Sequence, residues 1–376
     1  MGHASQGDRF PPRRRRGTGC VLSRMETVLP RCLIAVRELY SALGLEGHVF
    51  FFLFGYGYLG VSLFFVVSGF CIHRPQAYKH ATTSSDRLDL WKFARRRFFR
   101  LYPAYFASLV FTSLTLCIFP AVLSLARHQP LNLLERADLP SLLTNAAFVQ
   151  QLRPHALEFN GVYWTLLLEV QFYVCYPMLL RVCRRIGFTA PLFILLLAEC
   201  IFSFWPTGIP VFILAHYFEW FLGMYLVERL ANNNPVKLPP LAAPIFFLFA
   251  VWSVFHPFVA SMEWIFAACG SAALIANCVP EKRDSVLESR WLVTVGLFSY
   301  SLYLVHIPVL DLFWNGTKIA QKFVPRIPMQ IALLGVLFAF AVGYFFFIAF
   351  ERPYFFEREK QVDLAIISVA LESDSQ

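Results

Sequence analysis

Residues 48–72 decide the fold of this chain, and they read HVFFFLFGYGYLGVSLFFVVSGFCI. The stretch is almost wholly apolar, and crossing a bilayer as a helix takes about 20 such residues. Four glycines inside it expose the backbone, so neighbouring helices can approach closely. An ionisable imidazole, His48, stands at its start. The pattern predicts tightly packed membrane helices with a titratable group at their edge.

The composition of the whole chain points the same way. Of its 376 residues, 57% are hydrophobic and only 15% are charged, against about 25% charged in soluble domains. The nine cysteines are an odd number, lie mostly in apolar spans, and show neither a CxxC pair nor a Cys/His metal spacing. We therefore expect buried cysteines, without a disulfide framework, a bound metal or a bound cofactor.

Apolar runs separated by short polar links predict an all-α, polytopic membrane protein: a single bundle of about ten transmembrane helices with both termini cytoplasmic. The expected domain covers 30–356, between a basic cytoplasmic tail at 1–29 and a second tail at 357–376. The predicted spans are 30–52, 56–73, 101–124, 161–182, 190–206, 209–228, 239–256, 259–279, 291–314 and 328–350.

The positive charges support this orientation. With the N-terminus inside, six of the 33 lysines and arginines lie on the outer side. This asymmetry is the positive-inside pattern of a multi-pass protein, here expected in the cell membrane (plasma or inner). The net charge of +9 then needs no nucleic-acid partner, and the lipid bilayer is the expected surrounding. The six outer residues are Arg127, Arg136, Arg153, Lys318, Lys322 and Arg326.

A dense basic run, WKFARRRFFRLYPAY, occupies residues 91–105. Arg97 and Arg100 within it are helical neighbours at i,i+3. One interpretation is a topology anchor that contacts lipid phosphates. The other is a landing site for a phosphorylated cytosolic donor, because guanidinium groups match phosphate oxygens.

The apolar span 161–180 contains a single carboxylate, Glu169. A carboxylate inside a membrane faces a partner or a wet cavity, so Glu169 is a candidate catalytic residue; pairing with an arginine is the structural alternative. Tyr173 lies at the edge of the same helical face, whereas Trp164 points elsewhere. Both are candidates for a substrate channel.

Near the C-terminus, residues 296–310 read GLFSYSLYLVHIPVL. Ser299, Tyr303 and His306 fall on one helical face. Ser299 and His306 are therefore further substrate-channel candidates, although a lone helical histidine is often a bundle residue without a chemical role.

His48 is the best candidate for a general base. A neutral imidazole takes the proton of an acceptor hydroxyl while that oxygen attacks a thioester; an interfacial histidine without a role is the alternative. The predicted layout places His48 near the outer end of its span and the arginine run inside. A donor would have to reach into the bundle.

Together these stretches resemble the integral-membrane acyltransferase family 3, which includes O-antigen and exopolysaccharide O-acyltransferases. The matching signatures, in order from about 37 to 353, are Arg37 and His48 with ten residues between them, GYLGVSLFFVVSGF, FARRRFFRLYPAY, GVYWTLLLEVQFYVCYP, SYSLYLVHIP and ERP.

The resemblance implies a ten-helix bundle that transfers an acyl group, commonly acetyl, from a cytosolic coenzyme A thioester to a hydroxyl of a carbohydrate or lipid-linked glycan. Acyl-CoA is then a co-substrate. It implies a catalytic His48 paired with Arg37, and donor handling by Arg97 and Arg100. Glu169 and Trp164 match the family's helix motif.

Two features depart from the family pattern. The interval between Arg37 and His48 reads ELYSALGLEG, where the family has small apolar residues, and Ser62 stands where an acidic residue is common. Two alternatives to the enzyme therefore stay open. One is a glycan or lipid transporter, and the other is a non-catalytic family member.

Overall fold

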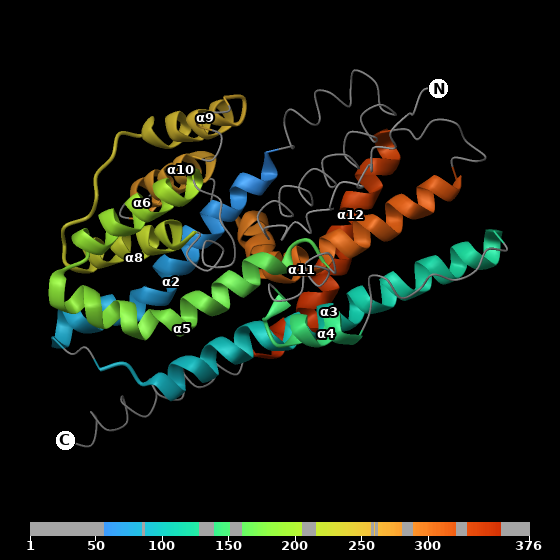
Figure 1. Cartoon of the computed structure of the whole chain (residues 1–376), viewed down its shortest axis with the longest axis horizontal. Helices are drawn as coiled ribbons and strands as arrows, with labels where there is room; N and C mark the ends of the chain where they lie inside the picture. Colours follow the sequence, from blue (N-terminus) through green and yellow to red (C-terminus); the bar gives the residue numbers. More distant parts are fainter. Residues whose placement is uncertain are drawn as a thin grey trace, which may run out of the picture.

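The computed structural model describes residues 56–84, 87–127, 139–150, 160–204, 216–256, 259, 262–279, 289–320 and 329–354. These parts are helical and contain no strand, as predicted (Figure 1). The predicted span 30–52, both tails, and the residues Arg37 and His48 lie outside the described residues.

The elements follow the predicted spans, with different ends. They are η1 (Gly57–Leu59), α2 (Gly60–Thr83), α3 (Leu90–Arg127), α4 (Leu139–Ala146), α5 (Tyr163–Ile186), α6 (Thr189–Phe204), α8 (Tyr217–Ala231), α9 (Ala242–Val254), α10 (Glu263–Cys278), α11 (Arg290–Ala320), α12 (Met329–Phe346) and η6 (Phe347–Glu351). The basic run 91–105 is part of α3, so its arginines lie on a helix rather than in a loop.

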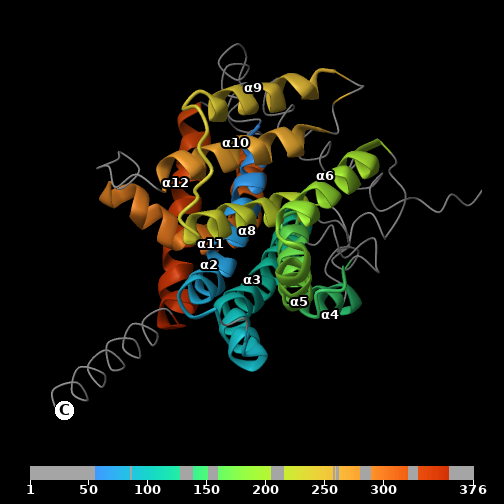
Figure 2. The ribbon, with the colours of Figure 1, turned by 90° about the vertical axis from the view of Figure 1, so that its left-hand side faces the viewer.

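Helices α2 and α8 form the centre of the bundle and pack backbone to backbone (Figure 2). A Cβ atom at Gly69 of α2 would lie 1.9 Å from the carbonyl oxygen of Trp220. A Cβ atom at Gly223 of α8 would lie 1.9 Å from the carbonyl oxygen of Val66. Only glycine permits such an approach, so the expectation of close helix packing around the glycine-rich stretch is confirmed.

The other helices surround this pair. Helices α9 and α10 pack together and α10 contacts α2 and α8, while α6 packs on α8. On the other side, α11 packs against α12 and α3, and η6 returns to α3. Helix α5 buries the larger part of its first half within the largest apolar cluster.

Four helical stretches are long and apolar enough to cross a membrane: Gly57–Thr83, Tyr163–Ile186, Arg290–Phe313 and Leu333–Tyr354. Three shorter apolar helices, Thr189–Ser203, Ala242–Val254 and Glu263–Cys278, accompany them. The chain is thus a helical, multi-pass type of membrane protein, whereas ten crossings and the side of the termini stay predictions.

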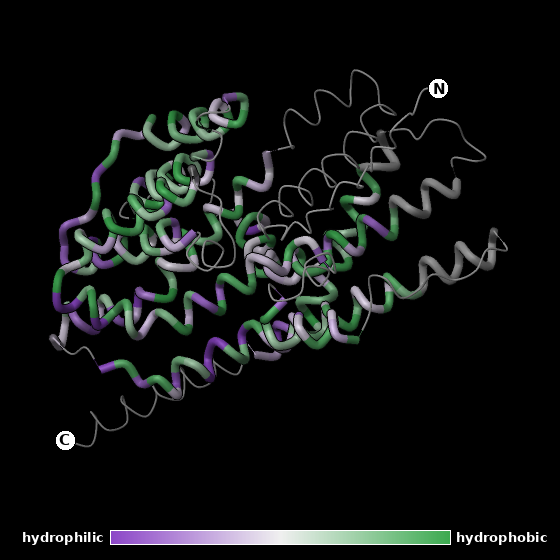
Figure 3. The backbone as a smooth tube through the Cα atoms, viewed as in Figure 1, coloured by the Kyte–Doolittle hydropathy of each residue, from purple (hydrophilic) through white to green (hydrophobic). Residues whose placement is uncertain are grey.

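The surface of the described helices fits a lipid environment. Large apolar side chains such as Phe193, Leu197, Leu248, Leu337 and Phe345 are exposed on α6, α9 and α12. Apolar surface this extensive is unusual on a soluble monomer. Hydrophilic residues instead gather where α2 and α5 end and α3 begins (Figure 3).

Candidate active site

Glu169 lies in the second turn of α5 with its side chain buried. The hydroxyl of Tyr173, one helical turn further on, donates a hydrogen bond to its Oε1 atom, and Ser68 Oγ of α2 donates a second at 3.3 Å. Its other oxygen, Oε2, is buried and has no hydrogen-bond partner among the described residues. Helices α2 and α5 therefore present a carboxylate with one unsatisfied acceptor.

Two arginines of α3 approach this carboxylate. The guanidinium of Arg97 lies 5.5 Å from the ring centroids of both Phe93 and Tyr173. Loss of solvent would lower the pKa of Arg100, but the phenol of Tyr173 and the carboxylate of Glu169 raise it, and the net shift is upward. The structure thus brings the predicted residues Arg97, Arg100, Tyr173 and Glu169 into one cluster. No described arginine forms a direct ion pair with Glu169.

The ERP motif supports the arginine helix from the opposite side. Ser301 Oγ of α11 donates a 2.6 Å hydrogen bond to Glu351 at the end of η6. Tyr300, next to Ser301, donates from its hydroxyl to the carbonyl oxygen of Leu101 at 3.0 Å. Glu351 also attracts Arg100 electrostatically, so the chain end holds α11 against the arginine run.

A pocket of about 810 Å³ opens where α2 and α5 end and α3 begins. Its wall carries four arginines and one lysine against one aspartate. Lys79 is held in place because its Nζ donates to the carbonyl oxygen of Arg87 at 2.8 Å. We call this the cationic pocket; its lining residues are Lys79, Arg87, Leu88, Asp89, Leu90, Pro177, Leu180, Arg181, Arg184 and Arg185.

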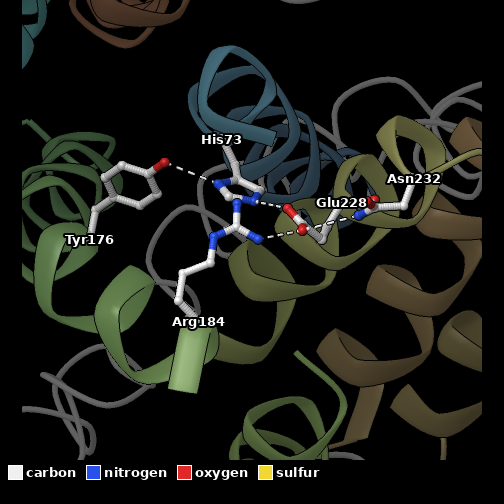
Figure 4. Close-up of polar contacts among 5 residues, drawn as sticks. All are labelled: His73, Tyr176, Arg184, Glu228 and Asn232. Atoms are coloured by element: carbon white, nitrogen blue, oxygen red, sulfur yellow. Dashed lines mark hydrogen bonds and ion pairs between the residues drawn. The ribbon is translucent and has the colours of Figure 1, made fainter. Parts of the chain in front are cut away.

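A buried polar network stands behind the cationic pocket (Figure 4). His73 Nε2 lies 2.9 Å from a carboxylate oxygen of Glu228, and His73 Nδ1 lies 3.0 Å from the hydroxyl of Tyr176. The other oxygen of Glu228 accepts from Arg184 at 2.5 Å and from Asn232 at 3.1 Å. A carboxylate only accepts, so a neutral His73 donates from Nε2 and accepts from Tyr176. The network joins α2, α5 and α8 and orients Arg184.

The remaining predicted residues lie elsewhere. The ring of Trp164 packs against His216 and Trp264, with centroids 5.5 and 6.1 Å away, rather than against Glu169. Ser299 and His306 line a second pocket, of about 330 Å³, between α11 and α12. We call it the apolar pocket; its lining residues are Ser299, Leu302, Tyr303, His306, Leu310, Val336, Ala339 and Phe340.

Several residues of these sites have no distinctive signal in the sequence. Ser68 carries no signal, because serines are common in glycine-rich membrane helices. Arg181, Arg184 and Arg185 lie at the end of the predicted span 161–182 with i,i+3,i+4 spacing, which places them on one helical face. The sequence shows this group of arginines, but the positive-inside rule already accounts for basic residues at the inner end of a span.

Comparisons with known proteins agree with the geometry. A family model described as an acyltransferase domain matches residues 38–352. A Bacillus subtilis (strain 168) protein described as "Putative peptidoglycan O-acetyltransferase YrhL" is 26% identical over 316 residues, which covers 75% of this chain and 48% of that protein. The chain thus spans about half the length of this relative. No solved structure matches the chain.

Proposed function

Because the chain belongs to the acyltransferase family whose domain model it matches, we propose that this acyltransferase is a membrane O-acyltransferase. It moves an acyl group, acetyl in the first instance, from a cytosolic coenzyme A thioester to a hydroxyl of a cell-surface or lipid-linked carbohydrate. The relative's description names peptidoglycan, so a peptidoglycan glycan is the first acceptor to test.

The cationic pocket is the observation that carries this proposal. Coenzyme A bears several phosphates, and arginine side chains bind phosphate oxygens through paired N–H donors. The pocket shares α3 and α5 with the Glu169 cluster: Pro177 of its wall lies one helical turn beyond Tyr173, and Leu90 lies two turns before Arg97. A donor whose phosphates occupy the pocket can direct its thioester along these helices toward Glu169.

The reaction follows from this arrangement. A base takes the proton of the acceptor hydroxyl as its oxygen attacks the thioester carbonyl. The tetrahedral oxyanion collapses, the carbon–sulfur bond breaks, and the coenzyme A thiolate leaves and is protonated. His48 is the proposed base. Glu169 and Tyr173 hold Arg97 and Arg100 where they face the donor.

Membranes incubated with labelled acetyl-CoA test the proposal. We expect transfer of label to glycan in wild type and its loss in His48→Ala, with His256→Ala as the matched control because His256 is exposed at the end of α9. Transfer that persists in His48→Ala refutes the base. A wild-type protein that moves glycan across the membrane without covalent label is a transporter, and one that does neither is a non-catalytic member.

A further inference from the structure

A second group of ionisable side chains lies apart from the Glu169 cluster. Glu199 of α6, His216 directly before α8, and Glu219 in the first turn of α8 each offer one ligand atom, and these atoms lie within 4.8 Å of one another. His216 Nδ1 is 2.7 Å from Glu219 Oε1 and 4.0 Å from Glu199 Oε1. Three potential ligands from two helices thus converge on one point.

These carboxylates lack the partners that buried charges need. Glu219 is fully buried and Glu199 is 8% exposed. The Oε2 atom of each is buried and has no hydrogen-bond partner in the part of the chain that the structure describes. Among the described residues, neither carboxylate forms an ion pair with a lysine or arginine. Burying a carboxylate without compensation is costly, so the cluster needs either a bound cation or a proton shared by its two carboxyls.

The surroundings hold His216 in place. Its ring packs against Trp264, Trp164 and Phe65, with centroid distances of 4.8, 5.5 and 5.5 Å. The side chain of His216 is 12% exposed. A rigid imidazole beside two buried carboxylates offers a nitrogen and oxygens in fixed positions, which is a donor set suited to a divalent transition metal.

We propose that Glu199, His216 and Glu219 bind a divalent transition-metal ion, with Zn²⁺ as the first choice. Two carboxylates and a neutral imidazole carry two negative charges, which one divalent cation balances. Zinc bonds to nitrogen and oxygen are about 2.0–2.2 Å long, so ligand atoms within 4.8 Å of each other surround an ion after small side-chain rotations. The ion would join α6 to α8. The sequence showed no such site because its ligands follow no short spacing motif.

Metal content of the purified full chain, without a metal-binding tag, tests this inference. After chelation and reloading with Zn²⁺, we expect about one specifically bound zinc per wild-type chain. Glu199→Gln and Glu219→Gln should each weaken this binding by about tenfold or more, since even outer-shell changes cost that much. Glu263→Gln is the matched control, a glutamate of α10 held by the hydroxyl of Tyr58 at 2.7 Å, and should bind as wild type does.

Thermal unfolding gives a second measurement on the wild-type chain alone. Added Zn²⁺ should raise its melting temperature, because a ligand that binds the folded state stabilises it. Equal zinc binding by wild type and both variants overturns the proposal. So does wild-type protein that retains no zinc and gains no stability from it, since the two carboxyls would then share a proton.

Discussion

The two pockets of this membrane protein differ in almost every respect. The cationic pocket, of about 810 Å³, lies at one end of the bundle and is lined by five positive side chains. The apolar pocket, of about 330 Å³, lies between α11 and α12 and is lined mostly by hydrocarbon. His306 lines the apolar pocket, and His73 lies in the polar network beside the cationic pocket. The two imidazoles have different hydrogen-bond partners. If the proposed function holds, we expect the first pocket to bind the phosphates of the donor and the second to contact the acceptor.

The largest expected effect separates the two histidines. His73→Ala removes one partner from a Glu228 oxygen and one from the Tyr176 hydroxyl and leaves a cavity, so we expect the free energy of unfolding to fall by about 3–5 kcal/mol. His306 makes one described hydrogen bond, to the carbonyl oxygen of Tyr303, so His306→Ala should cost only about 1 kcal/mol. Thermal unfolding in detergent measures both. Equal losses in the free energy of unfolding would show that the two histidines contribute equally to stability.

Removing charge from the cationic pocket should impair donor use. The double change Arg181→Ala with Arg185→Ala should raise the KM for acetyl-CoA by about 100-fold, since each charged hydrogen bond contributes about 1.5 kcal/mol or more. The KM for the acceptor should not change. Steady-state assays in membranes measure both constants.

Arg290→Ala is the control for this prediction, because Arg290 is an exposed cation at the start of α11, outside the pocket. A donor KM that stays constant in the double variant would identify the pocket arginines as lipid-phosphate anchors.

Filling the apolar pocket should impair use of the acceptor and leave use of the donor unchanged. Ser299 lines this pocket and is exposed to it, so Ser299→Leu should lower kcat/KM for a lipid-linked acceptor by about tenfold, within the range for added methylenes in a binding site. Donor KM should stay constant. Leu297→Phe, on the exposed face of α11, is the control. A rise in donor KM instead would assign this pocket to the acyl donor.

The smallest expected effect concerns salt. The cationic pocket is partly open, so added salt screens its arginines, with a Debye length near 8 Å at physiological ionic strength. We expect the KM for acetyl-CoA to rise about threefold when NaCl increases tenfold. The KM for the acceptor, which we expect to contact the apolar pocket, should not change with salt. A donor KM without salt dependence contradicts phosphate binding by exposed arginines.

Local patterns predicted much of the fold. Apolar runs located the described spanning helices, but α2 ends well after the predicted span 56–73 and α3 begins well before the predicted span 101–124. The i,i+4 spacing of Glu169 and Tyr173 corresponds to a hydrogen bond. The arginine run belongs to the single continuous helix α3, Leu90–Arg127. Hydropathy alone does not show this continuity.

Contacts between helices could not be predicted in the same way. Glu228 of α8 contacts His73 of α2 and Arg184 of α5. Glu199 of α6 lies close to His216, which directly precedes α8. Such pairs depend on how helices rotate and cross, and no periodicity within one segment encodes this. His48, the residue that the motifs favoured most, lies outside the described residues, so its role stays a proposal.

The close approach of α2 and α8 at Gly69 and Gly223 has a dynamic consequence. With less than a methyl group of clearance on either side, α2 and α8 cannot slide or rotate past each other without steric overlap. They must move as one rigid body. Any opening that admits a bulky sugar chain therefore has to come from displacement of the helices around this pair.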